Sequence, residues 1–162
     1  MSQIRPAAPA DWPQMRQIFQ EVIAGGDTYV FAADTPEADA HAYWFGPGIS
    51  TFVAADDTGA VLGMYKLVTN ARDRGSHVAN ASFMVSMRAR GRGIGREMGL
   101  RALEEARRRG YLAMQFNFVV STNASAVALW QSLGFQIVGT LPKAFRHQQL
   151  GLVDAYVMYR FL

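Results

Sequence analysis

The sequence predicts an α/β fold in which helices flank a mixed β-sheet. Three observations support this prediction. Segments with apolar residues at helical spacing alternate with β-like segments along the chain. Asp56, Asp57, Thr58 and Gly59 form a turn signal between two β-like runs, which indicates an antiparallel hairpin. A glycine-rich stretch separates a β-like run from a helical one. At 162 residues the chain has the length of one domain, so a single domain over residues 1–162 is expected.

The first helix is expected to begin after Asp11, a candidate N-cap, with Pro13 in its first turn, and to end near Gly25. Apolar residues recur at helical spacing within it: Met15, Ile18, Phe19, Val22 and Ile23. A shorter helix is expected after the start signal Thr35-Pro36-Glu37.

The remaining elements follow from β-like runs and helical periodicity. Helices are expected over residues 94–109, ending at Gly110, and 123–133, ending at Gly134. Six strands are expected, over residues 51–55, 60–69, 77–86, 111–120, 135–141 and 152–161. His147 falls in the predicted connection between the last two strands.

Composition narrows the class of protein. Half of the residues are hydrophobic and 18% are charged, as in globular proteins. No apolar run approaches the length of a membrane span, so no membrane partner is expected. The chain has no cysteine, and residues 1–10 lack the layout of a secretion signal. We therefore expect a cytoplasmic protein, and no metal site is predicted.

Basic residues concentrate in one region. Eight of the sixteen lysines and arginines lie between Arg88 and Arg109. This concentration is compatible with a solvated helix face partly neutralised by Glu97, Glu104 and Glu105, with a phosphate site, or with a nucleic-acid surface. Charge alone does not decide among them.

The glycine-rich loop lies where a strand is followed by a helix, and it contains Arg90, Gly91, Arg92, Gly93, Ile94, Gly95 and Arg96. Backbone N–H groups converge at a helix N-terminus, and glycines allow a phosphate to approach them closely. The loop lacks the Gly-Lys-Ser/Thr ending of nucleoside triphosphatases and comes too late in the chain for a dinucleotide fold. It predicts a pyrophosphate site.

The motif Arg90-x-x-Gly93-x-Gly95 after an apolar strand resembles the acetyl-CoA signature of the GCN5-related N-acetyltransferase (GNAT) family. The order of elements is similar over nearly the whole chain. The resemblance implies a mostly antiparallel sheet with a splayed pair formed by strands 77–86 and 111–120, and acetyl-CoA as cosubstrate. It places the pantetheine arm on the backbone of Phe83, Met84 and Val85, and the pyrophosphate on the loop amides of residues 91–96.

The segment from Asn123 through Trp130 to Gly134-Phe135 is similar to a second family motif. Asn123 is a helix cap, a hydrogen-bond partner of the pantetheine arm or thioester, or both. Many members carry a tyrosine at the position of Trp130, where it is assigned as the acid that protonates the departing thiolate. An indole N–H does not titrate usefully, so either the thiolate leaves without a dedicated acid or a hydrogen bond from Asn123, the expected catalytic residue, stabilises it.

Residues 77–85, 117–123 and 153–159 resemble the acetyltransferases that act on proline analogues such as azetidine-2-carboxylate. This resemblance implies that Asn80 holds the substrate and that the backbone amides of Asn117 and Phe118 receive its carboxylate. The expected function is acetyl transfer to a small amine, an amino acid or proline analogue.

Two other functions remain open: acetylation of protein N-termini, and a nonenzymatic module that binds nucleic acid or acyl-CoA. Bulky aromatic residues that could enclose a small site weaken the peptide alternative: Tyr29, Phe31, Trp44 and Phe45. No aromatic residues interleave the basic stretch, so no nucleic-acid partner is expected. A homodimer is compatible with the family.

The attacking amine must be neutral, and the sequence does not single out a base. A water chain is the first choice. The candidate side chains are Glu21, Asp27, His41 and His77.

Overall fold

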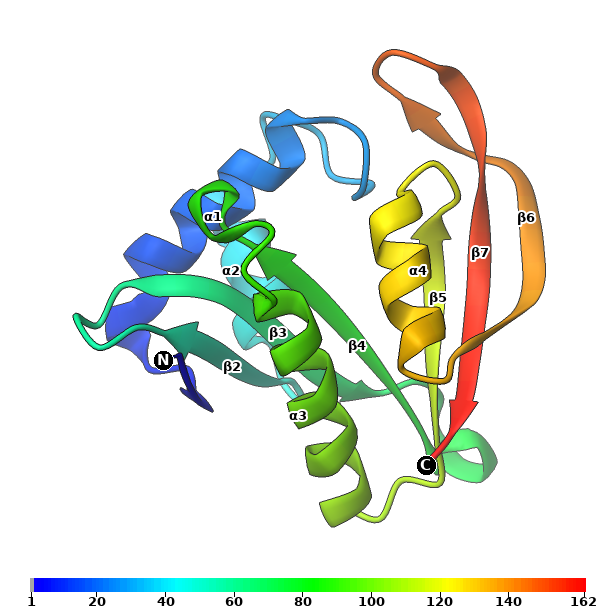
Figure 1. The fold of residues 1–162 in the computed structure, drawn as a ribbon, viewed down its shortest axis with the longest axis horizontal. Helices are drawn as coiled ribbons and strands as arrows, with labels where there is room; N and C mark the ends of the chain where they lie inside the picture. Colours follow the sequence, from blue (N-terminus) through cyan, green and yellow to red (C-terminus); the bar gives the residue numbers. More distant parts are fainter. Residues whose placement is uncertain (1) are drawn as a thin grey trace.

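The computed structural model describes residues 2–162, which form one seven-stranded sheet and four α-helices (Figure 1). The elements follow in the order β1 (Gln3–Pro6), α1 (Trp12–Ala24), α2 (Glu37–Phe45), β2 (Ser50–Ala55), β3 (Val61–Thr69), β4 (Val78–Val85), α3 (Ile94–Arg108), β5 (Ala113–Val120), α4 (Ala124–Ser132), β6 (Gln136–His147) and β7 (Gly151–Phe161). The strand order is β1-β2-β3-β4-β5-β7-β6. All neighbours are antiparallel except β4 and β5, so the predicted mixed, mostly antiparallel sheet is confirmed.

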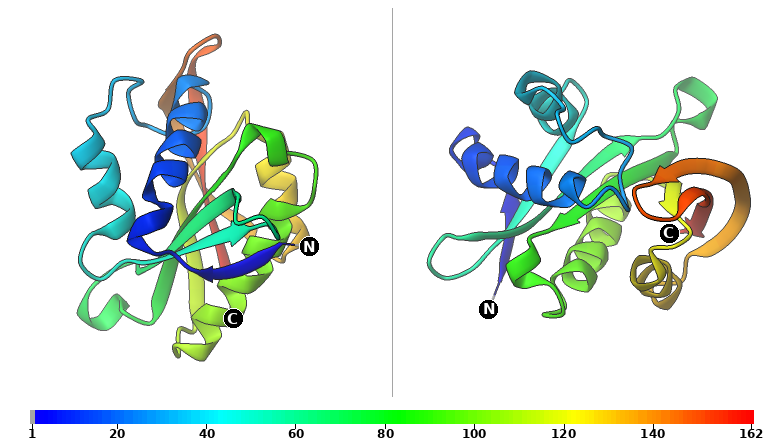
Figure 2. Two further views of the ribbon diagram at one scale, coloured as in Figure 1. Left: turned by 90° about the vertical axis from the view of Figure 1, so that its left-hand side faces the viewer. Right: turned by 90° about the horizontal axis from the view of Figure 1, so that it is seen from above.

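Helices cover both faces of the sheet: α1 and α2 lie on one face and α3 and α4 on the other (Figure 2). Successive strand residues point to opposite faces, so side chains of β3 pack against the helices on both faces. Met64 packs with residues of α1 and α2, including Phe19 and Trp44. Tyr65 packs on the opposite face, in the cluster that contains Met98 of α3. The two buried clusters hold the sheet between the helix layers.

The sheet opens in its middle, between β4 and β5. These parallel strands pair only at Val78 with Ala113 and at Ala79 with Met114. Beyond those residues the strands diverge, as Figure 1 shows, and α4 lies beside the diverging end of β5. The splayed pair expected from the family resemblance is therefore present. It leaves backbone groups of both strands without a strand partner at the centre of the molecule.

Two strands differ from the sequence predictions. Strand β1 was not predicted, because four residues ending in Pro6 are too few for a period-2 pattern. An edge strand tolerates this proline. Strand β6 continues past Leu141 through His147, because the register shifts between Leu141 and Phe145, where Lys143 adopts a φ of 50°. His147 thus ends a strand instead of lying in a loop.

The expected capping role of Asp11 is also corrected. Asp11 precedes α1, but its side chain makes no cap hydrogen bond to the helix. Its carboxylate accepts two hydrogen bonds from Arg5, at 2.7 and 2.8 Å, and a third from the N–H of Ala8 at 2.8 Å. The Arg5 guanidinium lowers the pKa of this buried carboxyl group. Asp11 therefore attaches β1 to the start of α1.

Within residues 2–162, no helix combines the length and the hydropathy needed to cross a bilayer.

Candidate active site

The glycine-rich loop leads directly into α3 and exposes its first backbone amides. Gly91 and Gly93 have φ values of 74° and 80°, which glycine adopts readily and other residues do not. The first helical hydrogen bond runs from the N–H of Glu97 to the carbonyl of Gly93, at 3.0 Å. The amides of Ile94, Gly95 and Arg96 come before that bond and have no acceptor within the helix. At the positive end of the helix dipole, such amides suit an anion.

A cleft of about 500 Å³ lies in front of these amides. Its walls come from the α1–α2 loop, the end of β4, the glycine loop and α4. It gathers nearly all residues that the sequence predicted for cofactor binding: Phe83, Met84, Val85, Arg90, Gly91, Gly93, Ile94, Gly95, Arg96 and Asn123. The predicted residue outside this lining is Arg92, which lies over a separate hollow with Asp56 and Glu97.

The β3–β4 pairing determines which backbone groups of β4 face the opening. The N–H of Asn70 bonds to the carbonyl of Val78 at 2.8 Å, and that of Ser86 bonds to Leu62 at 2.9 Å. In an antiparallel ladder, alternate residues direct their backbone groups toward and away from the partner strand. Met84, two residues from Ser86, therefore bonds to β3. Phe83 and Val85 direct their N–H and C=O groups away from β3, into the splay.

Tyr29 occupies one of these positions. Its hydroxyl donates to the carbonyl of Phe83 at 2.6 Å and accepts from the N–H of Phe83 at 3.0 Å. Burial is the main cause that raises the pKa of the Tyr29 phenol, so this hydroxyl stays protonated. The two backbone groups of Phe83 are thus already bonded, whereas Val85 has no such side-chain partner within residues 2–162.

A second, smaller pocket of about 250 Å³ adjoins the cleft. The two share six lining residues: Thr28, Tyr29, Phe83, Asn123, Ala126 and Trp130. The predicted substrate residues Asn80, Asn117 and Phe118 all line the smaller pocket. Tyr29, Phe31 and Tyr43 form its aromatic wall. The smaller pocket therefore adjoins the cleft that the glycine loop lines.

Strand β5 has a bulge inside this pocket. Its register with β7 shifts between Phe116 and Val119, so Asn117 and Phe118 have no assigned partner on β7. An extra residue in one strand disrupts the local ladder and leaves backbone groups for other partners. The Asn117 side chain points elsewhere, because it donates to Asn70 and accepts from Gln115, each at 2.8 Å. The backbone of Asn117, which has no assigned partner on β7, is available to a bound molecule.

Asn123 lies where the pocket and the cleft meet. Its side-chain oxygen accepts from the N–H of Ala126 at 3.4 Å and from the Ser125 hydroxyl at 3.2 Å, so Asn123 caps α4. Its amide nitrogen makes no hydrogen bond within residues 2–162. Both roles considered for this residue are therefore compatible: the oxygen caps the helix while the N–H groups remain free to donate.

Trp130 is a packing residue at the same junction. Its ring lies 4.7 Å from that of Phe83 and 4.8 Å from that of Phe116, measured between centroids. It is buried in the cluster beneath α3 and α4. Tyr29 and Phe31 confirm the expected aromatic wall, but Trp44 and Phe45 do not belong to it. Trp44 is fully buried beside α1, and Phe45 packs against Trp12.

The candidate bases are widely separated. Asp27 lines the cleft, whereas Glu21, His41 and His77 line neither the cleft nor the pocket. Glu21 instead accepts a hydrogen bond from the N–H of Met87 at 3.3 Å, and His41 stacks on Phe45. Among the described residues that line the smaller pocket, the ionisable side chains are Tyr29 and Tyr43, and burial raises the pKa of both.

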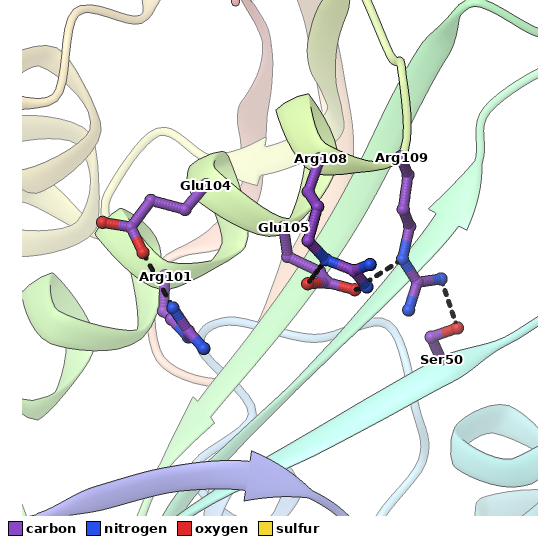
Figure 3. Close-up of polar contacts among 6 residues, drawn as sticks. All are labelled: Ser50, Arg101, Glu104, Glu105, Arg108 and Arg109. Carbon is purple, nitrogen blue, oxygen red and sulfur yellow. Dashed lines mark hydrogen bonds and ion pairs between the residues drawn. The ribbon is translucent and has the colours of Figure 1, made fainter.

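The basic stretch divides into two parts. Near the C-terminus of α3, Arg101 pairs with Glu104 at 3.0 Å, and Arg108 and Arg109 pair with Glu105 at 2.6 and 2.7 Å (Figure 3). At the other end, Arg90, Arg92 and Arg96 have no ion-pair partner within residues 2–162. The glycine loop and the first turn of α3 thus carry three arginines without an ion-pair partner.

Comparison with known proteins agrees with this geometry. The sequence profile of the acetyltransferase (GNAT) family matches residues 12–135. This chain belongs to the GNAT family. A GNAT enzyme from Kribbella flavida has the same fold, with a TM-score of 0.94, 44% sequence identity, and coverage of 99% of this chain and 98% of that one.

Two characterised relatives are also similar to this GNAT protein. The L-amino acid N-acetyltransferase AaaT of Escherichia coli is 31% identical over 97% of this chain and 96% of its own length. The N-acetyltransferase aca1 of Schizosaccharomyces pombe is 37% identical over 106 residues, which are 63% of this chain. The matched region spans half, 50%, of the length of aca1.

GNAT enzymes use acetyl-CoA, and the residues of the cleft fit this group. A Cβ added to Gly91 or Gly93 would meet no atom within 4 Å, so the space before the loop amides is open. The amides and arginines suit a pyrophosphate, and the free edge of β4 at Val85 suits an amide-containing arm. When bound, acetyl-CoA supplies the acetyl group as an activated thioester.

Proposed function

We propose that this enzyme acetylates the amine of a small α-amino acid, proline analogues included, with acetyl-CoA as donor. One observation carries the proposal. Asn80 and the bulge at Asn117 and Phe118 line one pocket, and that pocket adjoins the cofactor cleft at Asn123. Backbone N–H groups free of a ladder can bind a carboxylate, and a carboxamide can orient the neighbouring amine.

Each residue has a separate task in this proposal. The amides of Asn117 and Phe118 bind the carboxylate, and Asn80, whose side chain has no hydrogen bond within residues 2–162, orients the amine. The free N–H groups of Asn123 stabilise negative charge that develops on the thioester as the amine attacks. No carboxylate or imidazole occurs among the described residues lining the pocket, so the amine loses its proton to water.

The size of the pocket supports a small substrate. Drug-sized ligands occupy pockets of roughly 300–1,000 Å³. This pocket measures about 250 Å³. A pocket of this size suits a small amine better than a peptide, so the protein N-terminal alternative is disfavoured. The name of the AaaT relative, an L-amino acid N-acetyltransferase, agrees with an amino-acid substrate.

The nonenzymatic alternatives receive less support. Three arginines of the basic stretch, Arg101, Arg108 and Arg109, are held in ion pairs with glutamates, which reduces the basic face available to nucleic acid (Figure 3). A module that only binds acyl-CoA does not require a second pocket that opens onto the thioester end of the cleft.

The test is free-thiol release from acetyl-CoA, measured with a panel of α-amino acids, azetidine-2-carboxylate, polyamines and short peptides. Release with amino acids or the proline analogue, and little with peptides or polyamines, is the expected result. Faster turnover of peptides would instead favour the N-terminal acetyltransferase. Salt-dependent nucleic-acid binding without thiol release from any amine would overturn acetyl transfer altogether.

A further inference from the structure

Lys66 on β3 is a buried cation without an anionic partner. Its exposed fraction is 8%. The ammonium donates to the carbonyl of Tyr43 at 2.8 Å and lies 3.2 Å from the centroid of the Tyr43 ring. Within residues 2–162 no carboxylate contacts it. Burying an unpaired charge costs free energy, so lysine at this position indicates a role other than packing.

The position of Lys66 relates it to the substrate pocket. In the sheet it pairs with Ser82 of β4, and the hydroxyl of Tyr43 donates to the Ser82 hydroxyl at 2.8 Å. Tyr43 and Ser82 both line the pocket, whereas Lys66 does not. The ammonium thus lies one side chain behind the wall of a pocket that, among its described lining residues, holds no charged group.

We propose that Lys66 determines substrate specificity: its buried ammonium acts through the Tyr43–Ser82 wall to favour amines that carry a carboxylate or another anionic group. This inference rests on the amino-acid acetyltransferase function proposed above. The bulge amides contact the carboxylate directly, and Lys66 supplies a full positive charge in contact with Tyr43.

Two physical effects support this role. Charge–charge interactions are stronger in a protein interior than in water, so a cation behind one aromatic ring attracts a bound anion. The same charge disfavours a second cation, so it favours the neutral, reactive form of the substrate amine. Burial lowers the pKa of Lys66 to about 8, so the Lys66 side chain is still mostly protonated at pH 7.

The experiment compares matched substrates that differ in charge. KM and kcat are measured for L-methionine and azetidine-2-carboxylate, and for the carboxamide of each. Lys66→Met removes the charge and keeps the length of the side chain. Lys143→Met, at the other lysine of the chain, removes an exposed charge as a control. We expect Lys66→Met to raise KM for the carboxylates about tenfold and KM for the carboxamides less than twofold, with Lys143→Met close to wild type.

If Lys66→Met changes KM for carboxylates and for carboxamides by the same factor, Lys66 only packs and the proposal is overturned. The same holds if Lys66→Met changes neither KM. If Lys66→Met does not fold, Lys66→Gln, which can still donate to the Tyr43 carbonyl, gives the same comparison. A wild-type enzyme that acetylates none of these compounds contradicts the amino-acid function and this inference together. If the wild-type enzyme prefers carboxylates to carboxamides and Lys66→Met keeps the same preference, this inference alone is contradicted.

Discussion

Asn80 and Asn123 are chemically identical side chains with different surroundings. Asn80 lies on β4 in the smaller pocket. Asn123 lies at the junction with the cleft, and its side-chain oxygen caps α4. We expect Asn80→Ala to raise KM for the amine several-fold with little change in kcat. Asn123→Ala should mainly lower kcat, by roughly ten- to a hundredfold, because a donor to a developing charge acts chiefly in the transition state. Steady-state kinetics with saturating acetyl-CoA checks both.

Loss of the α4 cap could imitate the effect of Asn123→Ala on kcat. Asn123→Asp is the matched control, because a carboxylate retains the cap acceptor and loses the amide donor. It should keep the melting temperature near wild type and still lower kcat. Unchanged kinetic constants in folded Asn80→Ala and Asn123→Ala proteins would remove the residue-level support for the substrate assignment.

Single residues differed in how far the sequence revealed them. Asn80, Asn117 and Phe118 could be proposed from a local resemblance, and they line one pocket. Tyr43 and Lys66 could not, because their importance depends on α2 lying over β3 and β4, and no sequence spacing encodes that contact. The hydroxyl of Tyr29 also reaches the backbone of Phe83, 54 positions away along the chain. Sequence indicated only that Tyr29 was bulky enough for a wall.

The glycine loop and α3 form the element to which we assign cofactor binding. Gly93 is the N-cap of α3 at a φ of 80°, and an added Cβ would meet no protein atom within 4 Å. Gly93→Asp therefore acts by two other routes: it strains a left-handed residue and places a negative charge at the anion site. We expect at least a tenfold loss of CoA affinity by calorimetry.

Gly59→Asp is the matched control for this substitution. Gly59 has a φ of 84° in the β2–β3 turn, with open space around it and no place in the cleft. The Gly59→Asp variant should have the same backbone strain as Gly93→Asp but an unchanged affinity for CoA. A folded Gly93→Asp protein that binds CoA as wild type does would show that the loop is not the pyrophosphate site.

Elements with a strong period or a clear boundary residue were predictable. Helices α1 and α3 begin and end within a residue or two of the expected positions, because Gly25 and Gly110 mark their ends. Strand β1 was missed because its pairing with β2 is long-range. The end of β6 was misplaced because Pro142 in the strand reads locally as a break, whereas pairing with β7 resumes beyond it.

At the scale of the whole molecule, an ion-pair group attaches α3 to the sheet. Glu105 bonds to Arg108 and Arg109, and Arg109 also donates to the Ser50 hydroxyl on β2 at 2.6 Å (Figure 3). These arginines lower the pKa of Glu105 from 4.5 to about 2. The unfolded chain thus binds more protons than the folded one between these values, so this stabilisation is complete above about pH 4.5 and is lost as pH falls toward 2.

We expect Glu105→Gln to flatten the acid side of the stability profile. Its melting temperature should fall less than that of the wild type between pH 6 and pH 3, although it starts lower at pH 6. Glu104→Gln is the control, because the Glu104 side chain is 61% exposed in its pair with Arg101 and such pairs contribute little. Parallel acid profiles for wild type and Glu105→Gln would contradict the coupling. A homodimer, which is compatible with the family, remains an untested expectation at this scale.

The splay between β4 and β5 also affects how the protein avoids aggregation. Exposed strand edges invite pairing with other chains, and proteins protect the edges on their outer surface. Here the unpaired edge of β4 lies inside the molecule, where a strand of a neighbouring chain cannot align with it. The Tyr29 hydroxyl shields that edge at Phe83. The protein can therefore keep unpaired β-strand backbone for ligand recognition at a place where it does not promote self-association.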